Sequence, residues 1–208
     1  MSQYFEIHPD NPQSRLIQQA VDIINKGGVV IYPTDSSYAI GCDLGNKKAV
    51  DKIRMIRQLD KHHNFTLVCR DLSEISQYAV VDNINYRLMK TLTPGPYTFI
   101  MQASRDVPKR LLNPKRKTIG VRVPDNAVCS ALLEELDQPL MSSTLMLPGE
   151  TLPMTDPHEI RLKLENMVDL IIDAGYSGHE PTTVVDLMSG TPEVVRQGLG
   201  EIDWLKQH

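Results

Sequence analysis

The stretch YPTDSSYAIGC, residues 32–42, follows the apolar run Gly28-Val29-Val30-Ile31 and decides how this chain is interpreted. The apolar run predicts a short buried strand that begins after a Gly-Gly break. A strand that ends in Pro, Thr, Asp and Ser delivers hydroxyls and a carboxylate to the edge of a sheet, where α/β folds tend to build ligand sites. The same residue types are the usual turn formers, so the pattern alone leaves a ligand site and a hydrogen-bonded turn both open.

Composition bounds the class of protein. The chain has 208 residues, about the size of one ordinary domain, and is 41% hydrophobic and 23% charged. These values predict a globular chain with a sizeable core. A net charge of −4 argues against wholesale electrostatic binding of nucleic acid, although a local basic face remains compatible with it.

The sequence also predicts a cytoplasmic protein without a membrane span. No apolar run approaches the roughly 20 residues that cross a bilayer, and the first residues lack the basic and apolar regions of a signal peptide. Cys42, Cys69 and Cys129 are odd in number and widely spaced, which favours reduced thiols. Cys69 and Cys129 lie in apolar stretches, and we expect them in the core.

Helical and strand patterns alternate along the chain, which is typical of a layered sheet-and-helix domain. Helices are expected from Asn11-Pro12 to Gly27, from Asn46, from Asp71, over 82–92 and 125–136, and from Asp156-Pro157 to Asn166. Strands are expected at 28–31, 65–69, 97–101, 119–123, 140–143, 168–172, 183–187 and 193–195.

Five segments, in order along the chain, resemble signatures of the YrdC/YciO family, the threonylcarbamoyl-AMP synthase-like proteins. They are residues 32–42, the PGPYTFI run at 94–100, the TIGVRVP run at 118–124, the TTVVD run at 182–186 and the VRQG run at 195–198. The likeness is greatest to the YciO branch. It implies an α+β fold: a single YrdC-like domain over residues 11–200, with a twisted mixed β-sheet flanked by helices around a concave basic cavity.

Two positions depart from the family pattern. The synthases carry a Lys-x-Arg pair where this chain has Arg57-Gln58-Leu59, and they carry Ser-x-Asn where it has Thr144-Leu145-Met146. One cation and one side-chain amide are therefore missing from the implied site. The resemblance predicts the fold, and the departures predict weak catalysis.

The implied reaction joins threonine, bicarbonate and ATP into threonylcarbamoyl-adenylate and pyrophosphate, for modification of an adenosine in tRNA. A carbamate oxygen attacks the α-phosphorus, so the protein contributes mainly positioning and neutralisation of charge. The resemblance implies ATP as a substrate, Mg²⁺ accompanying it, and no tightly bound cofactor or protein-bound metal.

Site residues follow from the same resemblance. It implies Arg57, Arg122 and Thr144 as catalytic residues, Thr34, Tyr38 and Lys61 on the substrate side, and Arg57, Arg122, Thr144, Thr182, Thr183 and Arg196 around the nucleotide. Arg122 lies on an otherwise apolar strand and is expected to point into the cavity. For Arg122 and Arg196 the alternative is an edge arginine paired to a surface carboxylate.

The segment Lys61-His62-His63-Asn64 follows the altered pair. Adjacent histidines suggest a metal site, but neighbouring side chains point apart on regular structure, so a solvated loop is the preferred interpretation. A lid that contributes Lys61 as a substitute cation is the alternative.

The densest positive stretch comprises Lys109, Arg110, Lys115, Arg116 and Lys117, which we call the basic stretch. It is either a solvated charge run or a rim that gathers ATP or RNA phosphates. The alternative function is therefore a double-stranded RNA- or tRNA-binding protein of the same fold without efficient catalysis. No interleaved aromatic residues support stacking on single strands.

Overall fold

One mixed sheet runs through the protein. The computed structural model describes residues 1–60 and 63–204, and within these residues ten strands form the sheet. In sheet order they are β1 (Gln3–Glu6), β8 (Leu170–Asp173), β2 (Val30–Tyr32), β3 (Ala39–Asp43), β7 (Leu140–Thr144), β4 (Thr66–Val68), β6 (Thr118–Arg122), β5 (Tyr97–Gln102), β9 (Thr183–Asp186) and β10 (Glu193–Arg196). With the helices that flank it, this sheet confirms the predicted α+β fold class.

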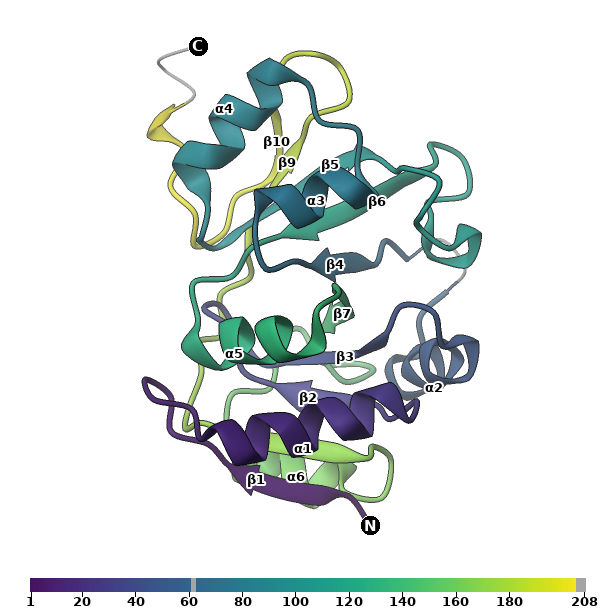
Figure 1. Ribbon diagram of the computed structural model, residues 1–208, viewed down its shortest axis with the longest axis vertical. Coiled ribbons are helices and arrows are strands. Elements are labelled where there is room, and N and C mark those ends of the chain that lie inside the picture. Colours follow the sequence, from purple (N-terminus) through teal and green to yellow (C-terminus); the bar gives the residue numbers. More distant parts are fainter. Residues whose placement is uncertain (61–62, 205–208) are drawn as a thin grey trace.

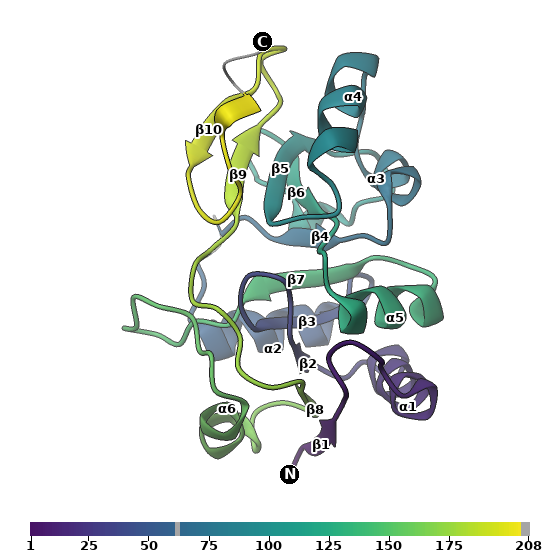
Figure 2. The same cartoon turned by 90° about the vertical axis from the view of Figure 1, so that its left-hand side faces the viewer.

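Six helices accompany the sheet in the described part of the chain, together with a 3₁₀ turn between β5 and β6 (Figure 1). They are α1 (Ser14–Asn25), α2 (Lys47–Arg57), α3 (Leu72–Tyr78), α4 (Asn83–Leu92), the 3₁₀ turn η1 (Lys109–Leu111), α5 (Ala127–Leu136) and α6 (Pro157–Leu164). Figure 2 shows α1, α5, α3 and α4 along one side of the molecule, while the segment between β7 and α6 lies on the other side. Among the described residues, no helix is both long and apolar enough to span a bilayer.

Short polar side chains begin most of the helices. Asn46, Asp71, Asp82, Asn126 and Asp156 each accept a hydrogen bond from a backbone N–H of the following turn. These caps explain why the predicted starts of α2, α3, α4 and α6 agree with the structure.

Helix α1 begins later than expected. Its N-cap is Gln13, without a side-chain cap bond. The backbone N–H of Asn11, the predicted cap, instead donates to Nδ1 of His8 at 3.1 Å. The segment before α1 is therefore a turn closed by a histidine.

Two strands were not expected from the sequence. Strand β1 precedes the predicted domain start at residue 11 and pairs in parallel with β8. Strand β3 pairs antiparallel with β2, with Val30 opposite Gly41. The residues between Tyr32 and Ala39 are thus the connection between two adjacent strands.

The core lies on both faces of the sheet. Helices α1 and α5 cover one cluster of buried apolar side chains, and α2, α3, α4 and α6 contribute to the other. Cys69 and Cys129 are buried in these clusters, as predicted.

Strand β6 shows how alternation of side chains creates the site. Ile119 and Val121 are fully buried in the core, while Thr118, Gly120 and Arg122 line a cavity on the opposite face. Successive side chains of a strand point to opposite faces. An apolar core and a polar cavity wall therefore share one short strand.

Candidate functional site

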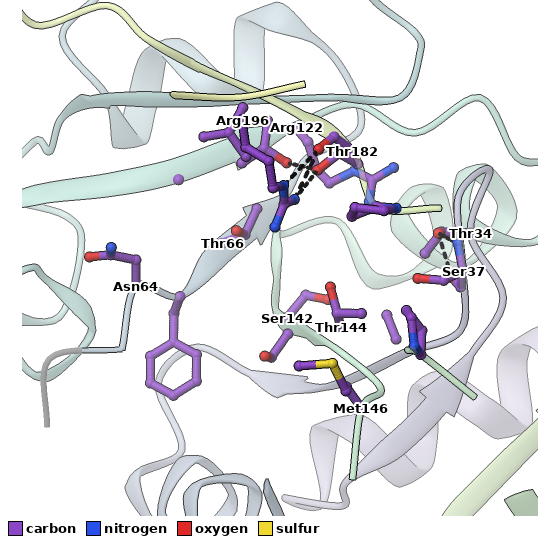
Figure 3. A pocket seen from close by; sticks show the side chains of 18 of the residues that line it. Thr34, Ser37, Asn64, Thr66, Arg122, Ser142, Thr144, Met146, Thr182 and Arg196 are labelled. Atoms are coloured by element: carbon purple, nitrogen blue, oxygen red, sulfur yellow. Dashed lines mark hydrogen bonds between the residues drawn. The ribbon is translucent and has the colours of Figure 1, made fainter. Parts of the chain in front are cut away.

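A cavity of about 540 Å³ lies on the face of β4, β6, β5 and β9 that the helices leave uncovered. Figure 3 shows three groups around it: Arg122, Arg196 and Thr182; Ser142, Thr144 and Met146; and Thr34 with Ser37. Three arginines line the cavity, and no Asp or Glu is found among its described lining residues. This charge pattern favours an anionic ligand.

Six of the residues expected at the site converge on this cavity. Thr34, Arg57, Arg122, Thr144, Thr182 and Arg196 all line it, although they come from separate elements. Lys61, also expected there, lies outside the described residues.

The structure places Tyr38 and Thr183 elsewhere. The Tyr38 hydroxyl donates to the Gly175 carbonyl at 2.7 Å and accepts from the Ala174 N–H at 3.2 Å. The Thr183 hydroxyl donates to the Gly200 carbonyl at 2.6 Å. Neither side chain lines the cavity. Tyr38 ties the connection between β2 and β3 to a later segment of the chain, and Thr183 does the same for β9. Spacing in the sequence does not reveal these contacts.

Thr34 shapes the loop between β2 and β3. Its Oγ1 donates to the Ser37 carbonyl at 2.6 Å and accepts from the N–H groups of Ser36 and Ser37, each at 3.2 Å. The ligand-site and turn interpretations of this stretch are therefore compatible, because a hydrogen-bonded turn forms part of the cavity wall.

Arg122 enters the cavity from the end of β6. It forms an ion pair with Asp35, and both side chains are almost fully buried. Asp35 also accepts the Asp125 N–H at 2.9 Å. The buried Nε of Arg122 has no hydrogen-bond partner among the described residues. Arg122 thus lines the cavity while paired to a buried carboxylate that does not line it, and the described residues leave its Nε without a partner.

Arg57 comes from the last turn of α2 and is only 8% exposed. Its Nε donates to the Met146 carbonyl at 2.8 Å, and its Nη1 donates to Ser143 Oγ at 2.5 Å. Burial lowers the pKa of the guanidinium. None of the ion pairs among the described residues involves Arg57.

Arg196 lies at the far end, on β10. Arg196 is exposed; its Nε and Nη2 donate to the Thr182 carbonyl at 3.2 and 2.9 Å, and partial desolvation lowers the pKa of its guanidinium. The Thr182 hydroxyl lies 2.9 Å from that of Thr98. This end of the cavity therefore combines a cation with a pair of hydroxyls.

Sequence reasoning missed His63 and Ser143. The sequence favours a solvated loop at residues 61–64, whereas in the structure the His63 ring lines the cavity with Nε2 3.2 Å from Ser143 Oγ. Burial, then the charges of Arg57 and Arg54, lower the pKa of His63 to about 4. His62 lies outside the described residues, and no group of three possible metal-binding side chains occurs among the described ones.

The two departures from the family pattern lie in different environments. Met146 lines the cavity. Leu59 is half-buried and packs against the apolar core. Of the two positions, only Met146 faces the cavity directly.

The basic stretch is partly engaged within the protein. Arg110 Nη2 donates to the Leu44 carbonyl at 2.8 Å, and Arg116 pairs with Asp186 at 2.7 Å. Lys109, Lys115 and Lys117 are exposed. Asn113 Nδ2, in the same segment, donates to Asn64 Oδ1 on the cavity rim at 2.9 Å. The stretch therefore adjoins the mouth of the cavity.

Comparisons with known proteins agree with this geometry. A family model named Sua5_yciO_yrdC and described as "Telomere recombination" matches residues 22–198. The chain is 59% identical to YciO of Escherichia coli K12 over 97% of this chain and 98% of that protein. It is 29% identical to the threonylcarbamoyl-AMP synthase of Vibrio vulnificus YJ016, over 88% of this chain and 98% of the relative.

Solved structures extend the likeness to three dimensions. The crystal structure of E. coli YciO superposes on this chain with a TM-score of 0.94, and the match covers 98% of both chains. The crystal structure of P. abyssi Sua5 complexed with L-threonine matches with a TM-score of 0.86 at 22% identity, over 94% of this chain and 57% of that one. From the family match, the close relative and the shared fold, we conclude that this chain belongs to the Sua5/YciO/YrdC family.

Proposed function

We propose that this protein is a threonylcarbamoyl-AMP synthase-like nucleotidyltransferase of low activity, which uses threonine, bicarbonate and ATP. One observation supports this most: three arginines and several hydroxyls from distant elements meet in a cavity without a described Asp or Glu in its lining. ATP and a carbamate are both anions, and such a cavity stabilises them together.

The chain's own residues have distinct tasks in this proposal. Arg57 and Arg122 neutralise phosphate charge, and Arg196 with Thr182 holds the other end of the nucleotide. Thr34 and Ser37 shape the wall on the amino-acid side. Mg²⁺ would arrive with ATP, because the described lining offers no carboxylate to hold it. The threonine-bound P. abyssi relative supports threonine as the amino acid.

Two measurements test the proposal. Isothermal titration should show ATP binding, and pyrophosphate release should depend on threonine and bicarbonate together. A protein that binds ATP but releases no more pyrophosphate with both co-substrates than without them would have another substrate.

The double variant Leu59→Arg, Met146→Asn should raise the rate of pyrophosphate release. One preorganised donor to a developing oxyanion is worth about 3 kcal/mol, or roughly a hundredfold in rate. The gain in rate from the Leu59→Arg change should be smaller than this hundredfold, because Leu59 packs against the core and an arginine there must first turn outward. Each single change should do less than the pair, because donors to one transition state couple. A folded double variant that binds ATP yet stays as slow as the parent would show that the missing pair does not limit the rate.

A second candidate function is binding of double-stranded RNA or tRNA. The contact between Asn113 and Asn64, which places the basic stretch beside the cavity mouth, favours it. Recognition would be of backbone and shape, since phosphates are what lysines on such a rim can reach.

A further inference from the structure

Arg57 is an unusual cation because it is buried without a described carboxylate beside it. Removing a charge from water is costly unless hydrogen bonds or an opposite charge compensate. Here the compensation comes from two neutral acceptors, the Met146 carbonyl and Ser143 Oγ. Neutral acceptors leave the positive charge of Arg57 in place for an anion.

The Ser143 hydroxyl is shared between Arg57 and His63. A guanidinium can only donate hydrogen bonds, so Ser143 Oγ is the acceptor in its bond with Arg57. The hydroxyl's own proton is then available to Nε2 of His63, 3.2 Å away. Such a bond requires a neutral imidazole with its proton on Nδ1. The low pKa of His63 agrees with this arrangement.

His63 is itself held in place by packing. Its ring meets the edge of Phe65 at a centroid distance of 5.3 Å and an angle of 77°. The Arg54 guanidinium lies 4.6 Å from the centroid of the Phe65 ring and donates to the carbonyls of Asp60 and Arg110. The imidazole therefore has a fixed position from which to orient Ser143.

We propose that Ser143 and His63 are positioning residues that hold the Arg57 guanidinium ready for a phosphate or pyrophosphate group. This inference rests on the proposed function, in which Arg57 contacts the nucleotide. Ser143 fixes the guanidinium, and His63 fixes Ser143. An arginine fork is effective for phosphate only when its direction is set, so loss of either support lowers anion affinity.

Inorganic pyrophosphate is the probe, and isothermal titration of the full chain is the measurement. Ser143→Ala and His63→Leu should each weaken binding about tenfold, as expected when a hydrogen bond to a charged group is lost. His63→Gln should stay within about threefold of the parent, because its amide can replace Nε2. The double variant Ser143→Ala, His63→Leu should also lose only about tenfold in pyrophosphate affinity, because His63 acts through Ser143 and the two losses do not add.

A background without the cation separates positioning from general structure. In an Arg57→Gln protein, Ser143→Ala should have no further effect on pyrophosphate binding. Matched controls are His158→Leu and Ser130→Ala, which change exposed residues of α6 and α5 and should bind as the parent does. His63 lies on a loop and is only partly buried, so its variants should keep the circular dichroism spectrum of the parent.

The outcomes distinguish this inference from the proposed function. A parent protein that binds neither pyrophosphate nor ATP overturns both. If the parent binds pyrophosphate and the two single variants bind equally well, only the positioning role is wrong. The positioning role is also wrong if the two losses add, if His63→Gln is as weak as His63→Leu, or if Ser143→Ala still weakens binding without Arg57.

Discussion

His63 is a histidine that stays neutral beside two arginines. Its pKa is about 4, whereas an ordinary histidine titrates near 6.5. Between these values the unfolded chain binds a proton at this position and the folded chain does not. Stability conferred by neutral His63 is therefore fully present above pH 6.5 and is lost as the pH falls toward 4.

This linkage predicts a specific effect of substitution. Urea unfolding at pH 7 and pH 5 should show that the parent loses more stability on acidification than His63→Gln does. The difference should be about 1 kcal/mol, after allowance for the partial exposure of the ring. Equal losses in both proteins would mean that His63 titrates normally in the folded state.

At the residue level, prediction from sequence succeeded where local pattern decides direction. The alternation of Thr118 to Arg122 is enough to turn Arg122 into the cavity. Local pattern does not predict a hydrogen bond between a hydroxyl or imidazole and a partner far away in the sequence. Ser143 and His63 are 80 residues apart, and the sequence around neither residue predicts their contact. The partner of the Tyr38 hydroxyl, the Gly175 carbonyl, is also distant in the sequence.

At the level of elements, helix starts depend on a single side chain. The Asn126 side chain accepts the Cys129 N–H at 3.0 Å and begins α5. Asn126→Ala should lower the free energy of unfolding by about 1 kcal/mol. Gln13→Ala is the matched control, because the Gln13 side chain makes no cap bond to α1. Its exposed Oε1 accepts the His8 N–H at 3.1 Å, so its loss should change stability less than loss of the Asn126 cap. Similar losses in both variants, measured by urea unfolding, would contradict a specific cap at Asn126.

The elements that sequence reasoning missed share a physical cause. Strand β3 is separated from β2 by only six residues, and its first residues fall within the stretch 32–42, which the pattern interprets as a ligand site or a turn. Strand β1 is four residues long, and only one of them is buried. Its assignment depends on pairing with β8, at the other end of the sequence, which local periodicity does not encode.

At the scale of the whole molecule, the five family-like segments become neighbours. They lie far apart in sequence, yet all five contribute side chains to one cavity: Thr34, Thr98, Arg122, Thr182 and Arg196. A recognisable order of motifs therefore predicted the convergence. The sheet order that brings β4 and β6 between β7 and β5 is a tertiary property, and no single motif contains it.

The overall charge sets the conditions for RNA binding. The protein carries a net charge of −4, so only a local group of lysines can attract a duplex. Lys109, Lys115 and Lys117 are exposed, whereas Arg116 is held by Asp186 and is left unchanged in the test. We expect weak, sequence-tolerant binding of double-stranded RNA that falls steeply as salt rises.

Changing these three lysines together to alanine should weaken the affinity and make its salt dependence shallower. If all three contact phosphates, the slope of log K against log salt should decrease by about 2 to 3. The control removes the same charge elsewhere, through Lys26→Ala, Lys47→Ala and Lys48→Ala, at exposed positions before and within α2. Fluorescence anisotropy with a labelled duplex at several salt concentrations measures both proteins. A slope that falls equally in the two triple variants would reflect net charge alone. An unchanged slope in the first would place any RNA-binding face away from the basic stretch.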